Sequence, residues 1–138
     1  MRGRMAYVTG FAVLLLASCA PKEDGSLAEG VAAAEEWLAL VDAGEYGKTW
    51  DVASEHFQSA VRRDQWVRLL ESNIGQRSGT PERTVRAADY KTLLDGSPPG
   101  HYVLVEFDTL VNGKAGGELV TMSGDGEGTW KAFAYYPR

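Results

Sequence analysis

The sequence predicts an α+β fold in which N-terminal helices pack on one face of a four-stranded antiparallel sheet. Apolar residues recur at helical spacing up to residue 74, and the period changes to two after residue 81. Asn112-Gly113 separates two alternating segments, as in a tight hairpin. Helices that precede an antiparallel meander cover one face of it. The 138 residues are enough for a single domain.

The chain begins with a segment typical of an exported lipoprotein. Arg2 and Arg4 precede the apolar run from Met5 to Leu16, which is too short to span a bilayer. The next residues complete a lipobox-like pattern, Leu16-Ala17-Ser18-Cys19, with the only cysteine of the chain. We expect a signal peptide over residues 1–18, cleavage between Ser18 and Cys19, acylation of Cys19, and a tether over residues 19–25. An ordinary secretory signal with a chance cysteine is the alternative.

The lipobox pattern also predicts a location. Two or more acyl chains hold a protein stably on a membrane. Ala20 follows Cys19 where inner-membrane retention signals typically carry Asp. We therefore expect a lipid-anchored protein of the cell envelope, on the periplasmic face of the outer membrane if the host has two membranes. The net charge of −5 gives no electrostatic reason to bind nucleic acid.

The single domain is expected over residues 26–138, with helices in its first half. Ser26-Leu27-Ala28-Glu29 has the pattern of a capping box, which predicts that the first helix begins at Ser26. Gly44 is expected to end it. Further helices are predicted over 46–53, from a Ser54 cap to about residue 60, and over 65–74 with Asp64 as the cap.

Four strands are predicted in the second half, over residues 82–94, 101–111, 118–123 and 129–136. In the second of these, Val103, Val105 and Phe107 share the face expected to meet the core. Regular alternation in the last strand places Trp130, Ala132, Ala134 and Tyr136 on one face, and Lys131, Phe133 and Tyr135 on the other.

Several widely spaced segments resemble the domain-of-unknown-function 4019 family. They are Ala34–Tyr46, Trp50, Gln65-Trp66, Arg77 with Gly79 and Arg83, Gly96–Val103, and Trp130–Arg138. Arg62 and Pro99 depart from the family pattern, where a Ser and an acid are common. The resemblance implies a cone-shaped fold similar to nuclear transport factor 2-like proteins, and it implies no activity, because the family has none assigned and such folds host many functions.

The chemistry-bearing residues predict neither a metal nor a cofactor. His56 and His101 lie in separate predicted elements, and no spacing matches a zinc site. Ser54-Glu55-His56 contains the residue types of a catalytic triad, but neighbours on a helix point in different directions. The segment 124–128 lacks the oxygen ligands of a calcium loop, so a plain turn is predicted there.

Aromatic residues are the candidate ligand-binding residues. Trp50, Trp66, Tyr90 and Tyr135 are the candidates for lining a groove between helices and sheet. For aromatic residues at helical spacing, such as Trp50 and Trp66, a place in the core is the usual alternative. Glu106 and Asp108 share a face of the second strand. If that face lined the interior, burial and mutual repulsion would raise one pKa and create a general base. We favour a solvent-facing pair, because the face with Val103 is the better core face.

The sequence therefore predicts a non-catalytic binding or interaction module. Its expected partners are the membrane, through lipid on Cys19, and an unknown envelope protein. Two rivals remain: a carrier of a small apolar molecule in a pocket between helices and sheet, and an enzyme that uses Glu106 or Asp108.

Overall fold

The computed structural model describes residues 22–138, and the expected signal peptide, its cleavage site at Ser18 and the acylated Cys19 lie outside the described residues. The described part confirms the predicted α+β class. Its elements are, in chain order, α1 (Lys22–Asp42), α2 (Tyr46–Asp51), α3 (Glu55–Ala60), α4 (Arg63–Asn73), β1 (Glu82–Lys91), β2 (His101–Val111), β3 (Lys114–Gly124) and β4 (Trp130–Pro137).

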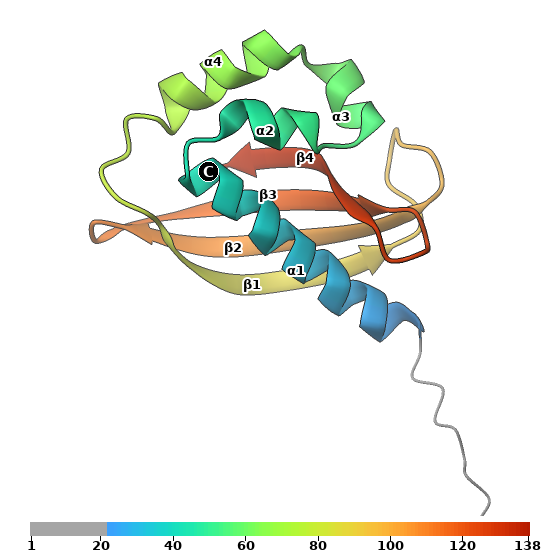
Figure 1. Cartoon of the computed structure of the whole chain (residues 1–138). Helices are drawn as coiled ribbons and strands as arrows, with labels where there is room; N and C mark the ends of the chain where they lie inside the picture. The colour runs from blue at the N-terminus through green and yellow to red at the C-terminus, as the bar shows by residue number, and fades with distance from the viewer. Residues whose placement is uncertain (1–21) are drawn as a thin grey trace, which may run out of the picture.

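The helices form one layer and the sheet a second layer (Figure 1). The four strands pair in the order β1-β2-β3-β4, and every neighbouring pair is antiparallel. Helix α1 crosses the sheet diagonally and contacts all four strands. Helices α2, α3 and α4 lie on the same side of the sheet as α1, and α2 runs back beside α1 (Figure 1).

The predicted helix starts are partly wrong. Helix α1 begins at Lys22, so Ser26 lies inside the helix and is not its cap. The helix therefore includes residues 22–25 of the expected tether. Helix α4 begins at Arg63, and its N-cap residue Arg62 makes no side-chain cap, so Asp64 is a first-turn acid instead of the predicted cap.

Two of the predicted local signals are confirmed. The Ser54 hydroxyl accepts a hydrogen bond of 3.2 Å from the backbone N–H of Phe57, which caps α3. Gly44 has φ +73° after the end of α1, a left-handed conformation that reverses the chain.

The hairpin between β2 and β3 is also confirmed, because Asn112 and Gly113 both have positive φ, 49° and 78°. The strand bounds differ at several ends. Strand β1 ends at Lys91 instead of residue 94, and its pairing with β2 shifts between Val85 and Ala87. Strand β3 is longer than predicted, from Lys114 to Gly124.

Strand β4 corrects the predicted alternation. Its pairing with β3 shifts by one residue, because Met122 pairs with Ala132 and Thr121 with Ala134. Phe133 is the extra residue of this bulge. As a result Ala132 and Tyr135 are both buried, although strict alternation would place them on opposite faces.

Aromatic rings fill the space between the two layers. Trp37, Phe57, Trp66 and Tyr135 contact one another with ring centroids 4.8–6.3 Å apart. They belong to one buried cluster with the apolar face of β2, which confirms the predicted core face; its residues are Val103, Val105 and Phe107. Edge-to-face and tilted contacts of this kind add to the free energy gained by burial.

Candidate binding site

Charged residues gather inside the fold where α1 ends against the sheet. Arg83 of β1 lies at the centre, with only 13% of its side chain exposed. Its guanidinium donates two hydrogen bonds, of 2.5 and 2.8 Å, to the carboxylate of Asp42, the last residue of α1. It also donates from Nε to Oε2 of Glu118 on β3, at 2.5 Å. Arg83 therefore joins a helix end to two strands.

Glu118 is the most deeply placed charge of this group, because its side chain has no exposed surface. Tyr135 donates a hydrogen bond of 2.7 Å to its Oε1, and Arg77 lies 3.5 Å from the same oxygen. Burial alone would raise the pKa of Glu118, but the bonds from Arg83 and Tyr135 and the two nearby positive charges hold it below its usual value. Glu118 is therefore a buried carboxylate anion.

The hydroxyl of Tyr135 is correspondingly a donor. Burial raises its pKa, and the negative charge of Glu118 raises it further. We call Asp42, Arg77, Arg83, Glu118 and Tyr135 the buried ion cluster. It holds two cations and two carboxylates, so its charges balance. Its contacts connect α1, the α4–β1 loop and three strands.

Three surface grooves meet at the buried ion cluster. The largest, of about 520 Å³, lies beside the β2–β3 hairpin and is lined in part by Arg77. A second, of about 480 Å³, reaches Glu118 from the side of Arg86. A third, of about 220 Å³, lies between Asp42 and Arg77. The hairpin, the α4–β1 loop, the C-terminal end of β4 and the end of α1 all lie at this end of the molecule (Figure 1).

A fourth groove, of about 340 Å³, lies between α1 and β4, and we call it the helix–sheet groove. Its lining is largely apolar and includes Leu40, Val52 and Trp130. Val52 is 44% exposed, which is high for a large apolar side chain. Exposed Glu36 and Lys131 line the same groove.

The four aromatic residues predicted to line one groove are not all brought together. Trp66 and Tyr135 lie in the core and contact each other. Trp50 is half-buried and packs beside the core. Tyr90 lies on β1, where its hydroxyl is 2.5 Å from Nδ1 of His101. None of the four lines the grooves described above.

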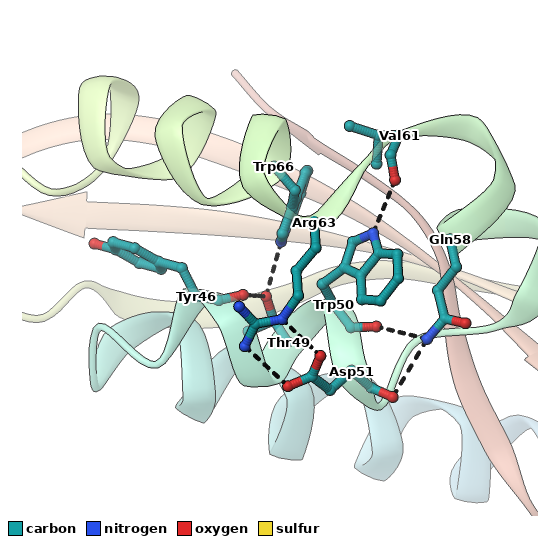
Figure 2. A network of polar contacts seen from close by, with 8 residues as sticks. All are labelled: Tyr46, Thr49, Trp50, Asp51, Gln58, Val61, Arg63 and Trp66. Carbon is teal, nitrogen blue, oxygen red and sulfur yellow. Dashed lines mark hydrogen bonds and ion pairs between the residues drawn. The ribbon is translucent and has the colours of Figure 1, made fainter.

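Indole N–H groups of the helical layer have partners within the fold, and Figure 2 shows those of Trp50 and Trp66. Trp66 donates to the hydroxyl of Thr49 at 2.8 Å, and Trp50 donates to the carbonyl of Val61 at 2.8 Å. Trp37 donates to the carbonyl of Thr49 at 3.0 Å. Thr49 itself has no exposed surface. The indole N–H groups of these three rings are therefore satisfied within the fold, and none is left to face a ligand.

The same network fastens α2 to α3 and α4. Arg63 makes two hydrogen bonds to the carboxylate of Asp51, at 2.8 and 3.1 Å. The side-chain amide of Gln58 donates to the carbonyls of Trp50 and Asp51 (Figure 2). The short helices are thus tied to one another by polar contacts as well as by the rings beneath them.

The carboxylates weighed as catalytic residues lie outside the core. Glu106 pairs with Arg86, and Asp108 is exposed. Within residues 22–138 no group of three or more His, Cys, Asp or Glu side chains is arranged to hold a metal. Asp125 accepts from the backbone N–H groups of Glu127 and Thr129, at 2.7 and 3.1 Å, which is the predicted plain turn.

Sequence reasoning missed the buried ion cluster as a unit. In the sequence, Arg77 and Arg83 stand out only through the family resemblance, and Glu118 only as the first residue of a predicted strand. One signal was present: Glu118 alternates with Val120 and Met122, both buried, so it belongs to the core face of β3. A carboxylate on that face requires a cation nearby.

A protein-family model matches most of the chain. The model described as Protein of unknown function (DUF4019) matches residues 33–135. The chain belongs to this family. The matched region of this DUF4019 protein contains the whole buried ion cluster and the rings of the core. No curated protein and no solved structure was found to match the chain. Among the helices of residues 22–138, none is long and apolar enough to cross a membrane.

Proposed function

We propose that this DUF4019 protein is a lipid-anchored, non-catalytic interaction module of the bacterial cell envelope. The basic residues, apolar run and lipobox-like Leu16–Cys19 segment support cleavage after Ser18 and acylation of Cys19. Ala20 supports transfer to the outer membrane, with the domain in the periplasm. The anchor then keeps the domain concentrated near the membrane surface, where it meets its partner.

One observation carries the choice of an interaction module over a carrier. The rings of Trp37, Phe57, Trp66 and Tyr135 pack against each other where a carrier of this architecture would hold its ligand. The grooves open at the surface instead. The helix–sheet groove offers apolar Leu40, Val52 and Trp130 to a side chain of a partner, between charges at Glu36 and Lys131.

We also propose that the fold is cone-shaped and nuclear transport factor 2-like. The element order supports this, because helices precede a four-stranded antiparallel meander and cover one of its faces. Such folds host binding modules as well as enzymes, so the proposal of a binding module rests on the filled core and not on the fold.

Site-specific photocrosslinking in living cells tests the proposal. A photoreactive residue at Val52 or Leu40 should give a discrete protein adduct. Leu69 of α4 is the control, because it is also a large, exposed apolar residue, at 49%, and does not line the helix–sheet groove. Replacing Cys19 with Ala should release the protein from the membrane and weaken the adduct.

Two results would overturn the proposal. Equal labelling from Val52 and Leu69 would show that the groove selects no partner. A co-purifying molecule of a few hundred daltons, found by native mass spectrometry, would favour the carrier. In that case Trp66→Ala, which opens a cavity in the core, should change the mass of the molecule that co-purifies with the protein.

A further inference from the structure

The groove of about 520 Å³ is distinguished by its charge. It lies between the β2–β3 hairpin, the α4–β1 loop and the last described residue, Arg138. Arg77, Lys114 and Arg138 line it, and none of its ten lining residues in the described chain is Asp or Glu. The protein as a whole has a net charge of −5. We call this the cationic groove.

Arg77 has hydrogen-bonding capacity to spare. Its one ion pair in the described chain, to Glu118, spans 3.5 Å. Glu118 receives shorter bonds from Arg83, at 2.5 Å, and from Tyr135, at 2.7 Å. A guanidinium carries five N–H donors, and a quarter of the Arg77 side chain is exposed. Arg77 can therefore keep its contact with Glu118 and donate to a ligand in the groove.

The walls of the cationic groove are fixed to each other. The side-chain amide of Asn112, at the hairpin turn, donates to the backbone carbonyl of Ser78 and lies 2.7 Å from its hydroxyl. This contact pins the hairpin to the α4–β1 loop. On another wall, Gly116 has no side chain and leaves the space beside it open. A Cβ at this position would lie 3.0 Å from the hydroxyl oxygen of Thr109. A site whose walls are already in place loses less entropy when it binds.

We propose that the cationic groove binds an oxyanion, a phosphate or carboxylate group carried by a soluble ligand. Arg77 supplies a planar set of donors that matches two oxygens of such a group. Lys114 supplies a second, movable charge on the facing hairpin. The hydroxyls of Ser78 and Thr109 lie in the same lining.

The position of the groove favours a soluble source over a lipid headgroup, a step that rests on the proposed function. The membrane anchor would precede Lys22, at the start of α1. The cationic groove lies near the other end of this 21-residue helix, which is about 30 Å long. The groove would therefore face away from the membrane that holds the anchor.

The test is an NMR titration of the full chain as cells produce it, in nanodiscs of phosphatidylcholine, with inorganic phosphate and with acetate as probes. The expected result is a saturable shift of amide signals in residues 76–78 and 112–116. Lys114→Gln should weaken binding about tenfold, the loss of about 1.4 kcal/mol. Arg77→Gln should weaken binding at least as much, and this variant also loses the ion pair between Arg77 and Glu118.

Lys91→Gln is the matched control, because Lys91 is exposed on β1, carries the same charge and does not line the groove. Its binding should be unchanged, and added salt should weaken binding in both proteins. Absence of a saturable shift, or equal binding by Lys114→Gln and Lys91→Gln, would overturn the proposal. Binding to nanodiscs of phosphatidylglycerol but to neither soluble probe would contradict the claim that the oxyanion belongs to a soluble ligand.

The two proposals fail separately. Phosphate binding at Arg77 and Lys114 without adducts at Val52 would support the oxyanion site and contradict the proposal of a protein partner in the helix–sheet groove. Adducts at Val52 without phosphate binding would do the reverse.

Discussion

Tyr135 donates a hydrogen bond of 2.7 Å to Glu118, and this contact exists because β4 carries a bulge at Phe133. Without the extra residue, Tyr135 would lie on the face of the sheet opposite to Ala132. With it, the phenol reaches the core face and meets a carboxylate that has no exposed surface. A local irregularity in the last strand thus completes the buried ion cluster.

Glu118→Gln should destabilise the protein strongly. The change keeps the shape of the side chain but removes one of the two carboxylates of the buried ion cluster. Arg83 keeps Asp42, whereas Arg77 loses its ion-pair partner in the described chain. Leaving a buried ionic group without its partner costs about 3 kcal/mol. Urea denaturation followed by tryptophan fluorescence measures this loss.

Glu106→Gln is the control for that measurement. It removes the same charge from an ion pair with Arg86 that lies nearer the surface, where the Arg86 side chain is 57% exposed. Such pairs contribute less than about 1 kcal/mol. Equal losses in the two variants would mean that the buried ion cluster does not hold the fold together.

Acid should remove the stabilisation that Glu118 provides. Its pKa lies below the ordinary value of 4.5 in the folded state, so the unfolded state binds more protons as the pH falls. The stabilisation is complete above about pH 4.5 and is lost as the pH falls through the folded pKa. The free-energy difference between wild type and Glu118→Gln should therefore shrink in urea titrations below pH 4.5. A difference that stays constant down to pH 3 would contradict the lowered pKa.

Thr49→Val should destabilise the protein, because it removes a buried hydroxyl group that makes two hydrogen bonds. Its oxygen accepts from the Trp66 indole, and its hydrogen goes to the carbonyl of Tyr46 at 2.6 Å (Figure 2). Valine fills the same space but leaves a buried N–H without a partner, which costs about 1–3 kcal/mol. Thr49→Ser keeps the hydroxyl, so it should lose less stability than Thr49→Val. Thermal denaturation of the two variants measures the difference. If serine were the worse of the two, packing and not the hydrogen bond would be the cause.

Short-range rules predicted the fold well and the candidate site poorly. The Ser54 cap, the Gly44 chain reversal and the Asn112-Gly113 hairpin depend on a few neighbouring residues, and all three are confirmed. The bulge at Phe133 depends on how β4 pairs with β3, and no residue type in β4 predicts it. The buried ion cluster joins residues up to 41 positions apart in the chain, as between Asp42 and Arg83. Their charges were visible in the sequence, but which charges meet is decided by the packing of α1 on the sheet.

Helix α1 packs tightly on the sheet at Gly30, where it meets β2. A Cβ at this position would lie 2.5 Å from Cγ2 of Val103, well inside contact distance. In an exposed helix, Gly→Ala stabilises by about 0.5–1 kcal/mol. Here Gly30→Ala should instead destabilise the protein, because forcing extra volume into a packed core costs about 1–3 kcal/mol. Val103→Ala removes the two Cγ atoms, at 2.5 and 2.9 Å, and keeps the Cβ, at 2.6 Å, so it relieves part of the clash and Gly30→Ala should cost somewhat less in that background. Urea denaturation of the four proteins of this double-mutant cycle gives the coupling energy directly. A coupling of zero would mean that the Cγ atoms of Val103 do not limit how closely α1 approaches the sheet.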